Sequence, residues 1–293
     1  MKTKIGLIIF LLTSIWISNA QTTTNRGTIK ESLTLSSKTL GRDIKYSVYL
    51  PADYTTSIRS YPVLYLLHGY SDNETSWIQF GEIEKAIDKL TSQSEFTPMI
   101  IVMPDAGETW YINNYDTTVR YEDAFFTDFI PTIEKIYRIR ATKEFRAIAG
   151  LSMGGYGSLL YAMKHSDKFA ACLAFSSAVY SDSFMKNRLK LGERNSNNCY
   201  GKLNGDELPK VWKMNSVLEL ASILPVSNLN ALKYYIDCGD KDALILGNSQ
   251  LNLILNERNV MHEFRVRAGK HEWTYWRQSI DDGLRFLTPI FSR

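Results

Sequence analysis

The fold is decided by residues 145–164, which read FRAIAGLSMGGYGSLLYAMK. The first five of these residues predict a strand, and the pattern from Gly155 onward predicts a helix. Between them, Gly150 and Gly154 flank Ser152 in the motif Gly-x-Ser-x-Gly. A serine in this setting sits on a sharp turn, so its neighbours must lack bulk, and the helix N-terminus beside it stabilises negative charge. The stretch therefore predicts a nucleophilic serine projecting between a strand and a helix.

Other interpretations of these glycines fit the sequence less well. A phosphate-binding P-loop needs a Lys-Ser/Thr pair after its last glycine, and a dinucleotide-binding loop needs Gly-x-Gly-x-x-Gly after the first strand. Neither pattern is present. A glycine-rich packing turn without chemistry is the remaining alternative.

Alternating strand and helix patterns extend from this stretch in both directions, without a linker or an internal repeat. Strands are predicted at Lys30–Leu35, Ile44–Leu50, Pro62–Leu67, Met99–Met103, Phe145–Ala149, Ala170–Phe175, Leu232–Ile236 and His262–Val266. Helices are predicted at Ile83–Leu90, Phe125–Tyr137, Gly155–Lys164, Leu244–Asn256 and Trp273–Leu287. The central strands are continuous apolar runs, as in strands buried on both faces. One α/β domain follows, with a mostly parallel sheet, helices on both faces, and ligands bound at the carboxyl ends of the strands.

Two regions depart from this alternation. The first two strands are separated by a turn at Gly41, so we expect them to pair antiparallel at an edge. Residues 179–230 contain no clear strand, and the Asn195–Asn198 cluster and Gly201–Gly205 predict loop. This insertion is either a lid or substrate wall over the strand ends, or ordinary irregular surface.

The N-terminus has the layout of a secretory signal peptide. Lys2 and Lys4 precede an apolar run that starts at Ile5, and small residues follow at Ser18 and Ala20. We expect cleavage after Ala20, so that residues 1–20 are the signal peptide and residues 21–293 are an exported catalytic domain, secreted or periplasmic. An uncleaved anchor is the alternative, and no second apolar stretch has the length of a membrane span.

Composition narrows the class further. The chain has 293 residues, 44% hydrophobic and 22% charged, which excludes disorder. Its net charge of +3 is not gathered in a basic block, so we expect no nucleic acid partner. Only three cysteines are present, so disulfides are not the scaffold. Cys172 and Cys238 lie in apolar segments, and at most one bridge can form, most plausibly with Cys199.

A catalytic serine needs a base, and the chain has four histidines. His68 precedes the serine, His165 lies in the helix after it, and His262 opens a strand. His271 remains, between the last strand and the last helix, which makes it the predicted base.

The catalytic histidine needs a carboxylate to orient it and stabilise its charge, and the tetrahedral oxyanion needs two backbone N–H donors. Asp242 is the predicted acid because it follows a strand and precedes a helix. Asp240 is the runner-up, and Asp237 is expected to anchor the turn. The oxyanion donors are predicted at Met153 N–H and Tyr70 N–H, with His68 bracing the loop before Tyr70.

The order of four motifs resembles a known family. These motifs are Leu66-Leu67-His68-Gly69, Gly150 to Gly155, Cys238 to Asp242, and Gly269-Lys270-His271-Glu272-Trp273. Together they resemble the esterase D-like α/β-hydrolases, which include S-formylglutathione hydrolases, feruloyl and acetylxylan esterases of the first carbohydrate-esterase family, and mycolyltransferases. The resemblance covers about residues 30–291. It implies the same triad and the same oxyanion donors, and it suggests a structural role for Tyr121-Glu122-Asp123.

These observations predict a serine esterase that removes feruloyl or acetyl groups from plant cell-wall polysaccharide or oligosaccharide, without a metal or cofactor. Export argues against cytosolic S-formylglutathione hydrolysis. Aromatic rings near the strand ends are expected to contact the substrate, first Trp110 and Tyr111 and then Trp273. The alternatives are an acyltransferase with the same triad, a short-chain carboxylesterase or thioesterase, and an inactive carbohydrate-binding module.

Overall fold

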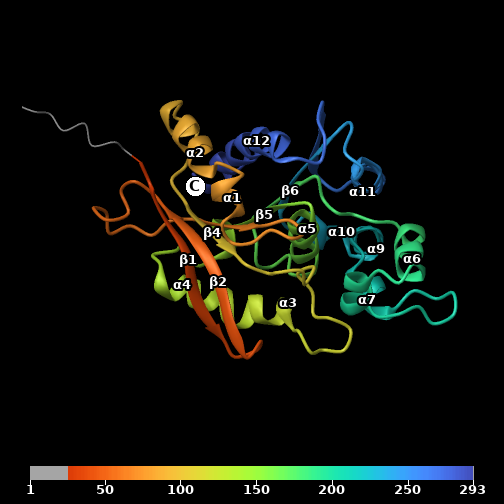
Figure 1. Cartoon of the computed structure of the whole chain (residues 1–293). Helices are drawn as coiled ribbons and strands as arrows, with labels where there is room; N and C mark the ends of the chain where they lie inside the picture. Colours follow the sequence, from red (N-terminus) through yellow and green to blue (C-terminus); the bar gives the residue numbers. More distant parts are fainter. Residues whose placement is uncertain (1–25, 293) are drawn as a thin grey trace, which may run out of the picture.

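A twisted sheet forms the centre of the computed structural model, which describes residues 26–292 (Figure 1). The predicted signal peptide, residues 1–20, lies outside the described residues. No helix within 26–292 combines the length and the apolar character needed to cross a membrane.

The sheet has eight strands in the order β1-β2-β4-β3-β5-β6-β7-β8. Their bounds are β1 Thr28–Ser37, β2 Arg42–Leu50, β3 Val63–Leu67, β4 Ile100–Pro104, β5 Arg146–Leu151, β6 Ala171–Phe175, β7 Lys233–Gly239 and β8 His262–Arg267. Strands β1, β2 and β4 pair antiparallel, and all other neighbours pair parallel. All eight strands predicted from the sequence are therefore present, including the antiparallel pair at one edge.

Helices cover both faces of the sheet, as predicted (Figure 1). One face carries α1 (Ser76–Gln79), α2 (Ile83–Ser92) and α12 (Trp273–Phe291). The other face carries α3 (Tyr121–Ala124), a π-helical turn (Phe125–Phe129), α4 (Ile130–Ile136), α5 (Met153–Lys164), α8 (Lys210–Asn215), α9 (Val217–Ile223) and α11 (Ile245–Glu257). A short 3-10 turn (Lys143–Phe145) leads into β5. Strands β3, β4, β5 and β6 are buried throughout, which explains their continuous apolar sequences.

The insertion between β6 and β7 is mostly helical. Besides α8 and α9 it contains α6 (Asp182–Lys190), α7 (Arg194–Tyr200) and α10 (Val226–Leu229). The prediction of loop at Asn195–Asn198 is therefore wrong. Asn and Ser are weak helix formers, but α7 buries Cys199 and Tyr200 against the body of the molecule, and that packing outweighs propensity. Residues 201–205 lie outside helices, as predicted.

The three cysteines are free and buried. The bridge that the sequence allowed at Cys199 is not formed. Burial, together with the nearby Glu108 carboxylate, raises the pKa of the Cys199 thiol to about 12. Since the thiolate is the reactive form, these thiols are expected to be inert in the folded protein.

The thiols give a direct test of this arrangement. We expect a thiol reagent such as Ellman's reagent at pH 8 to leave the folded protein almost unmodified and to titrate three thiols after unfolding without a reductant. A single thiol in the unfolded, unreduced protein would instead reveal a disulfide. The same titration after reduction is the control, because it must give three thiols in either case.

Candidate active site

The serine motif forms a tight turn between β5 and α5. Ser152 has φ of 54° and ψ of −117°, a conformation that L-residues adopt only under constraint. A Cβ atom at Gly150 would lie 2.4 Å from the backbone of Gly154, and one at Gly154 would lie 2.6 Å from the carbonyl oxygens of Leu67 and His68. The two glycines are therefore required by backbone contacts, and the turn they permit presents Ser152 at the carboxyl end of β5.

The three residues predicted as a triad lie in one hydrogen-bonded chain. His271 Nε2 is 2.9 Å from Ser152 Oγ, and His271 Nδ1 is 2.8 Å from Asp242 Oδ2. They follow the carboxyl ends of β5, β7 and β8, which the sheet order places close together although 119 positions separate Ser152 from His271. The His271 side chain is 35% exposed, so the site is open to solvent and substrate. A hydroxyl, an imidazole and a carboxylate in this order can perform nucleophilic catalysis with a general base.

Asp242 is a buried carboxylate with fixed partners. Its Oδ1 accepts a hydrogen bond from the Leu244 N–H at 2.8 Å, while Oδ2 faces His271. Burial alone would raise its pKa, but the hydrogen bonds from His271 and Leu244 outweigh burial, so the pKa of Asp242 lies below its ordinary value. Asp242 is therefore charged at neutral pH and able to stabilise a protonated His271.

Asp240 and Asp237 position the loops instead of contacting His271. Asp240 Oδ1 accepts the Gly269 N–H at 2.9 Å, two residues before His271, and the Lys241 N–H donates to Gly269 O at 3.0 Å. Asp237 accepts a hydrogen bond from the Ser279 hydroxyl at 2.9 Å and forms an ion pair with Arg267. The Asp240 and Lys241 contacts join the loop after β7 to the loop after β8, and the Asp237 contacts tie β7 to β8 and to α12.

The loop before Tyr70 is braced by His68. The His68 ring is buried, its Nε2 accepts the Ala106 N–H at 2.9 Å, and its Nδ1 lies 2.7 Å from Gly69 O. Within residues 26–292, neither the Tyr70 N–H nor the Met153 N–H donates to a protein acceptor. Both predicted oxyanion donors are thus available to a ligand.

The remaining histidines have structural partners. His165 Nε2 is 2.9 Å from Glu122 Oε1, and His262 Nε2 is 2.8 Å from Asn252 Oδ1. Glu122 is buried and also accepts a hydrogen bond from Lys164 Nζ at 2.6 Å, in keeping with the structural role suggested for it. No group of three or more His, Cys, Asp or Glu within 26–292 is arranged to hold a metal ion.

Tyr111 does not fit the expectation that it contacts the substrate. It is completely buried, its ring packs over Gly157, and its hydroxyl donates to His68 O at 2.9 Å. No face of the ring is open to a ligand. Tyr111 instead supports the loop before Tyr70 from below, a role that depends on tertiary contacts and could not be inferred from its place in the chain.

Trp110 and Trp273 belong to two different clusters of aromatic rings. Trp110 is only 4% exposed, and its ring centroid is 6.1 Å from that of Tyr70 and 5.7 Å from that of Tyr156. Trp273 is half-buried and packs at 5.2 Å against Trp276, whose ring lies edge-on to His271 at 4.8 Å. Trp273 is therefore one ring away from His271 and partly open, whereas Trp110 is enclosed by other rings and leaves little surface for a substrate.

The insertion adds two residues around Trp110 that sequence reasoning missed. The Tyr180 ring lies 6.0 Å from the Trp110 ring, and the Arg188 guanidinium lies 5.2 Å from the Tyr180 ring. Neither residue belongs to a motif, so the sequence carries no signal for them. These contacts pack the insertion against the loop after β4, and the interpretation of the insertion as a lid or substrate wall stays a prediction.

Comparison with known proteins identifies an esterase family and its fold. Residues 37–287 match the family model described as "Putative esterase". A solved ferulic acid esterase superposes with a TM-score of 0.79 and 31% identity, covering 91% of this chain and 99% of that structure. A fluorophosphonate-binding serine hydrolase of Staphylococcus aureus superposes with a TM-score of 0.77 at 24% identity over 90% of this chain and 99% of that one, which supports the fold.

Curated relatives have related names. The match to an endo-1,4-beta-xylanase/feruloyl esterase of Xylanibacter ruminicola is 32% identical over 55% of this chain and 23% of the relative. An acetyl esterase of Caldicellulosiruptor saccharolyticus is 24% identical over 78% of this chain and 83% of the relative. An esterase of Mycobacterium tuberculosis is 41% identical over 44% of this chain, but the match spans 28% of its length. The chain thus spans about a quarter of the length of several curated relatives.

Substitutions at two positions, Asp242 and Asp240, separate the proposed acid from its neighbour. Asp242→Asn should reduce kcat on the order of 10⁴-fold, because the amide no longer fixes the imidazole tautomer or stabilises its charge. Asp240→Asn retains an acceptor for the Gly269 N–H and should remain close to wild type, whereas Asp240→Ala should lose at most about 10²-fold through displacement of His271. Steady-state hydrolysis of p-nitrophenyl acetate measures all three. A greater loss in Asp240→Asn than in Asp242→Asn would reverse the assignment.

The lowered pKa of Asp242 also predicts how the stability of the folded protein changes in acid. Because its folded pKa is lower than its unfolded pKa, its contribution is present above the unfolded value and is lost as the pH falls through the folded value. Urea unfolding should therefore show the largest difference in free energy between wild type and Asp242→Asn near neutral pH, with the difference shrinking below about pH 4. A difference that stays constant from neutral to acid pH would contradict a lowered pKa at this residue.

Proposed function

This chain belongs to the family described as "Putative esterase", and from that membership and the site geometry we propose that it is an exported serine esterase. The observation that carries the proposal is the hydrogen-bonded chain from Ser152 through His271 to Asp242. Esterase is also the activity that the family description and the names of its relatives share.

The proposed reaction has two halves. Ser152 Oγ attacks the ester carbonyl carbon as its proton passes to His271 Nε2, and the resulting oxyanion receives hydrogen bonds from the Tyr70 and Met153 N–H groups. The tetrahedral intermediate collapses, the alcohol leaves with the proton from His271, and an acyl-enzyme remains. Water then attacks the acyl-enzyme with His271 as base, which releases the acid and restores Ser152.

Acylated plant polysaccharide or oligosaccharide is the proposed substrate class, with feruloyl or acetyl as the acyl group. The support is indirect: the solved neighbour is named a ferulic acid esterase, and two curated relatives are named for feruloyl and acetyl esters. The partly exposed rings of Tyr70 and Tyr180, which pack against the buried Trp110 ring, suit a planar acyl group. Cleavage of a signal peptide after Ala20 would bring the enzyme to such a substrate.

Removal of the nucleophile tests the activity. Ser152→Ala should lower kcat on the order of 10⁶-fold, as in comparable serine hydrolases, because the remaining groups cannot form the acyl-enzyme. The thermal unfolding midpoint should change little, since alanine keeps the Cβ atom and removes only the hydroxyl that faces His271. The substrates are methyl ferulate, acetylated xylan, S-formylglutathione and p-nitrophenyl acetate.

Covalent labelling of the serine is a second test of the nucleophile that does not depend on the choice of ester. A fluorophosphonate probe should label wild type at Ser152 and leave Ser152→Ala unlabelled, which mass spectrometry of the tryptic peptide will show. Ester hydrolysis by Ser152→Ala at the wild-type rate would refute the proposal. Hydrolysis of S-formylglutathione alone would refute the proposed substrate class and leave the triad in place.

A further inference from the structure

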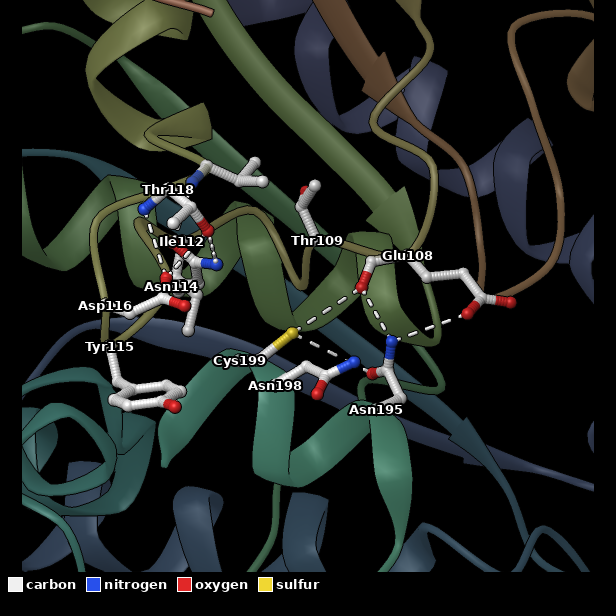
Figure 2. Close-up of a pocket in the computed structure, with 11 residues that line it drawn as sticks. Glu108, Thr109, Ile112, Asn114, Tyr115, Asp116, Thr118, Asn195, Asn198 and Cys199 are labelled. Atoms are coloured by element: carbon white, nitrogen blue, oxygen red, sulfur yellow. Dashed lines mark hydrogen bonds between the residues drawn. The ribbon is translucent and has the colours of Figure 1, made fainter. Parts of the chain in front are cut away.

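A separate pocket lies between the loop after β4 and helix α7 (Figure 2). Its volume is about 340 Å³, and its lining does not include Ser152, Asp242 or His271. One wall follows the carboxyl end of β4, and the other belongs to the insertion that follows β6. The pocket therefore lies at the same edge of the sheet as the Ser152 site, where ligands bind in folds of this kind.

Glu108 connects this pocket to Tyr70, in the loop after β3. It lines the pocket, and its Oε2 accepts a hydrogen bond from the Tyr70 hydroxyl at 2.9 Å. The backbone N–H of Tyr70 is one of the two proposed oxyanion donors. On the pocket side, the Asn195 amide donates to Glu108 O at 3.1 Å (Figure 2). Glu108 thus lines the pocket and is hydrogen-bonded to the side chain of Tyr70, the residue whose backbone N–H would hold the reacting carbonyl.

The lining has the chemistry of a site for a neutral, hydroxyl-rich molecule. It offers amides at Asn195 and Asn198 and carboxylates at Glu108 and Asp116. Among residues 26–292, no Lys, Arg or His lines it, so it has nothing to neutralise an anionic ligand. Carboxylates and amides are good partners for vicinal hydroxyls, since between them they accept and donate hydrogen bonds.

Tyr115 adds an aromatic surface to these polar groups. Its side chain is 51% exposed, although it lines the pocket. The ring lies over Gly201, where an added Cβ would approach it to 3.2 Å, so one part of the ring is supported by backbone. The Tyr115 N–H also donates to Cys199 O at 3.0 Å, which ties this loop to α7. A supported, partly exposed ring beside hydrogen-bonding groups suits the C–H face of a sugar.

Two of these side chains have unused hydrogen-bonding capacity. Asn198 is exposed on α7, and its amide makes no hydrogen bond within the described part of the chain. Asp116 Oδ1 accepts from the Thr118 N–H and hydroxyl at 3.0 and 2.7 Å, while Oδ2 has no such partner in residues 26–292. A ligand could therefore bind to both without breaking contacts that hold the loop.

We propose that this pocket binds the neutral sugar unit carrying the ester, on the alcohol side of the scissile bond. The inference rests on the proposed esterase function and adds the part of the substrate that the Ser152 site does not itself recognise. Glutathione, which carries carboxylates, is a poor match to a pocket with two carboxylates and no cation. The pocket thus favours sugar esters over glutathione thioesters.

The test compares two esters that differ only in their alcohol. Methyl ferulate has no sugar, and a feruloylated arabinoxylo-oligosaccharide carries one. Asn198→Ala and Tyr115→Ala should each raise KM for the sugar ester roughly threefold to tenfold, the effect of one lost hydrogen bond or ring contact. For methyl ferulate, kcat and KM should stay within about twofold of wild type. Tyr115→Phe keeps the ring and should retain most of the affinity.

Asn228→Ala is the matched control, because Asn228 is an exposed asparagine in α10, before the amino end of β7 and away from the pocket. Equal KM changes on both esters, or none on the sugar ester, would overturn the inference while the esterase activity stands. If the wild-type protein hydrolysed none of the esters, the proposed esterase function itself would be refuted. Saturation-transfer NMR can measure binding of the oligosaccharide to the inactive Ser152→Ala variant. Binding should weaken when Asn198→Ala is added to this variant and should remain when Asn228→Ala is added. Equal binding by both would count against the pocket.

Discussion

The close approach of backbone segments around Ser152 is the constraint on which the site depends. Helix α5 starts immediately after the serine, and Gly154 in its first turn lies against the carbonyl oxygens of Leu67 and His68 at the end of β3. A side chain at Gly150 or Gly154 would separate these segments. Ser152 then adopts a positive φ, a strain on the order of 1–3 kcal/mol that the surrounding packing must offset. The same contact brings the loop before Tyr70 next to the serine.

A second constraint is the burial of the Asp242 carboxylate, which is hydrogen-bonded to His271. The Asp242 side chain is fully buried, and a buried carboxylate is costly unless hydrogen bonds satisfy it. The Leu244 N–H and His271 Nδ1 provide those bonds, so the acid and the base hold each other in place. Hydrogen bonds between Asp240, Lys241 and Gly269 keep the two loops in register. The electrostatics of the site are therefore set by loop geometry at the ends of adjacent strands.

The insertion between β6 and β7 shapes the surroundings of this machinery. Tyr180 and Arg188 pack near Trp110, and α7 closes one side of the neighbouring pocket. The catalytic chain uses residues at strand ends, whereas the walls draw on the insertion and on the loop after β4. The proposed catalytic residues and the walls around them thus belong to different parts of the chain, as is common when function is built on a widely used fold.

The sequence by itself predicted the order of the strands along the chain, the serine turn, and His271 and Asp242 as the partners of Ser152. These predictions depend on local periodicity and on motifs with few alternatives. The sequence could not determine that α7 is a helix or that Tyr111 is buried beneath the site. Nor could it identify Tyr180 and Arg188 as part of a wall. Those features depend on which distant segments pack together. Helix α7 is stabilised because Cys199 and Tyr200 are buried against the core, and Tyr111 is enclosed by Gly157 and His68. Local patterns record backbone preference and amphipathicity, whereas burial against remote residues is decided only when the chain folds.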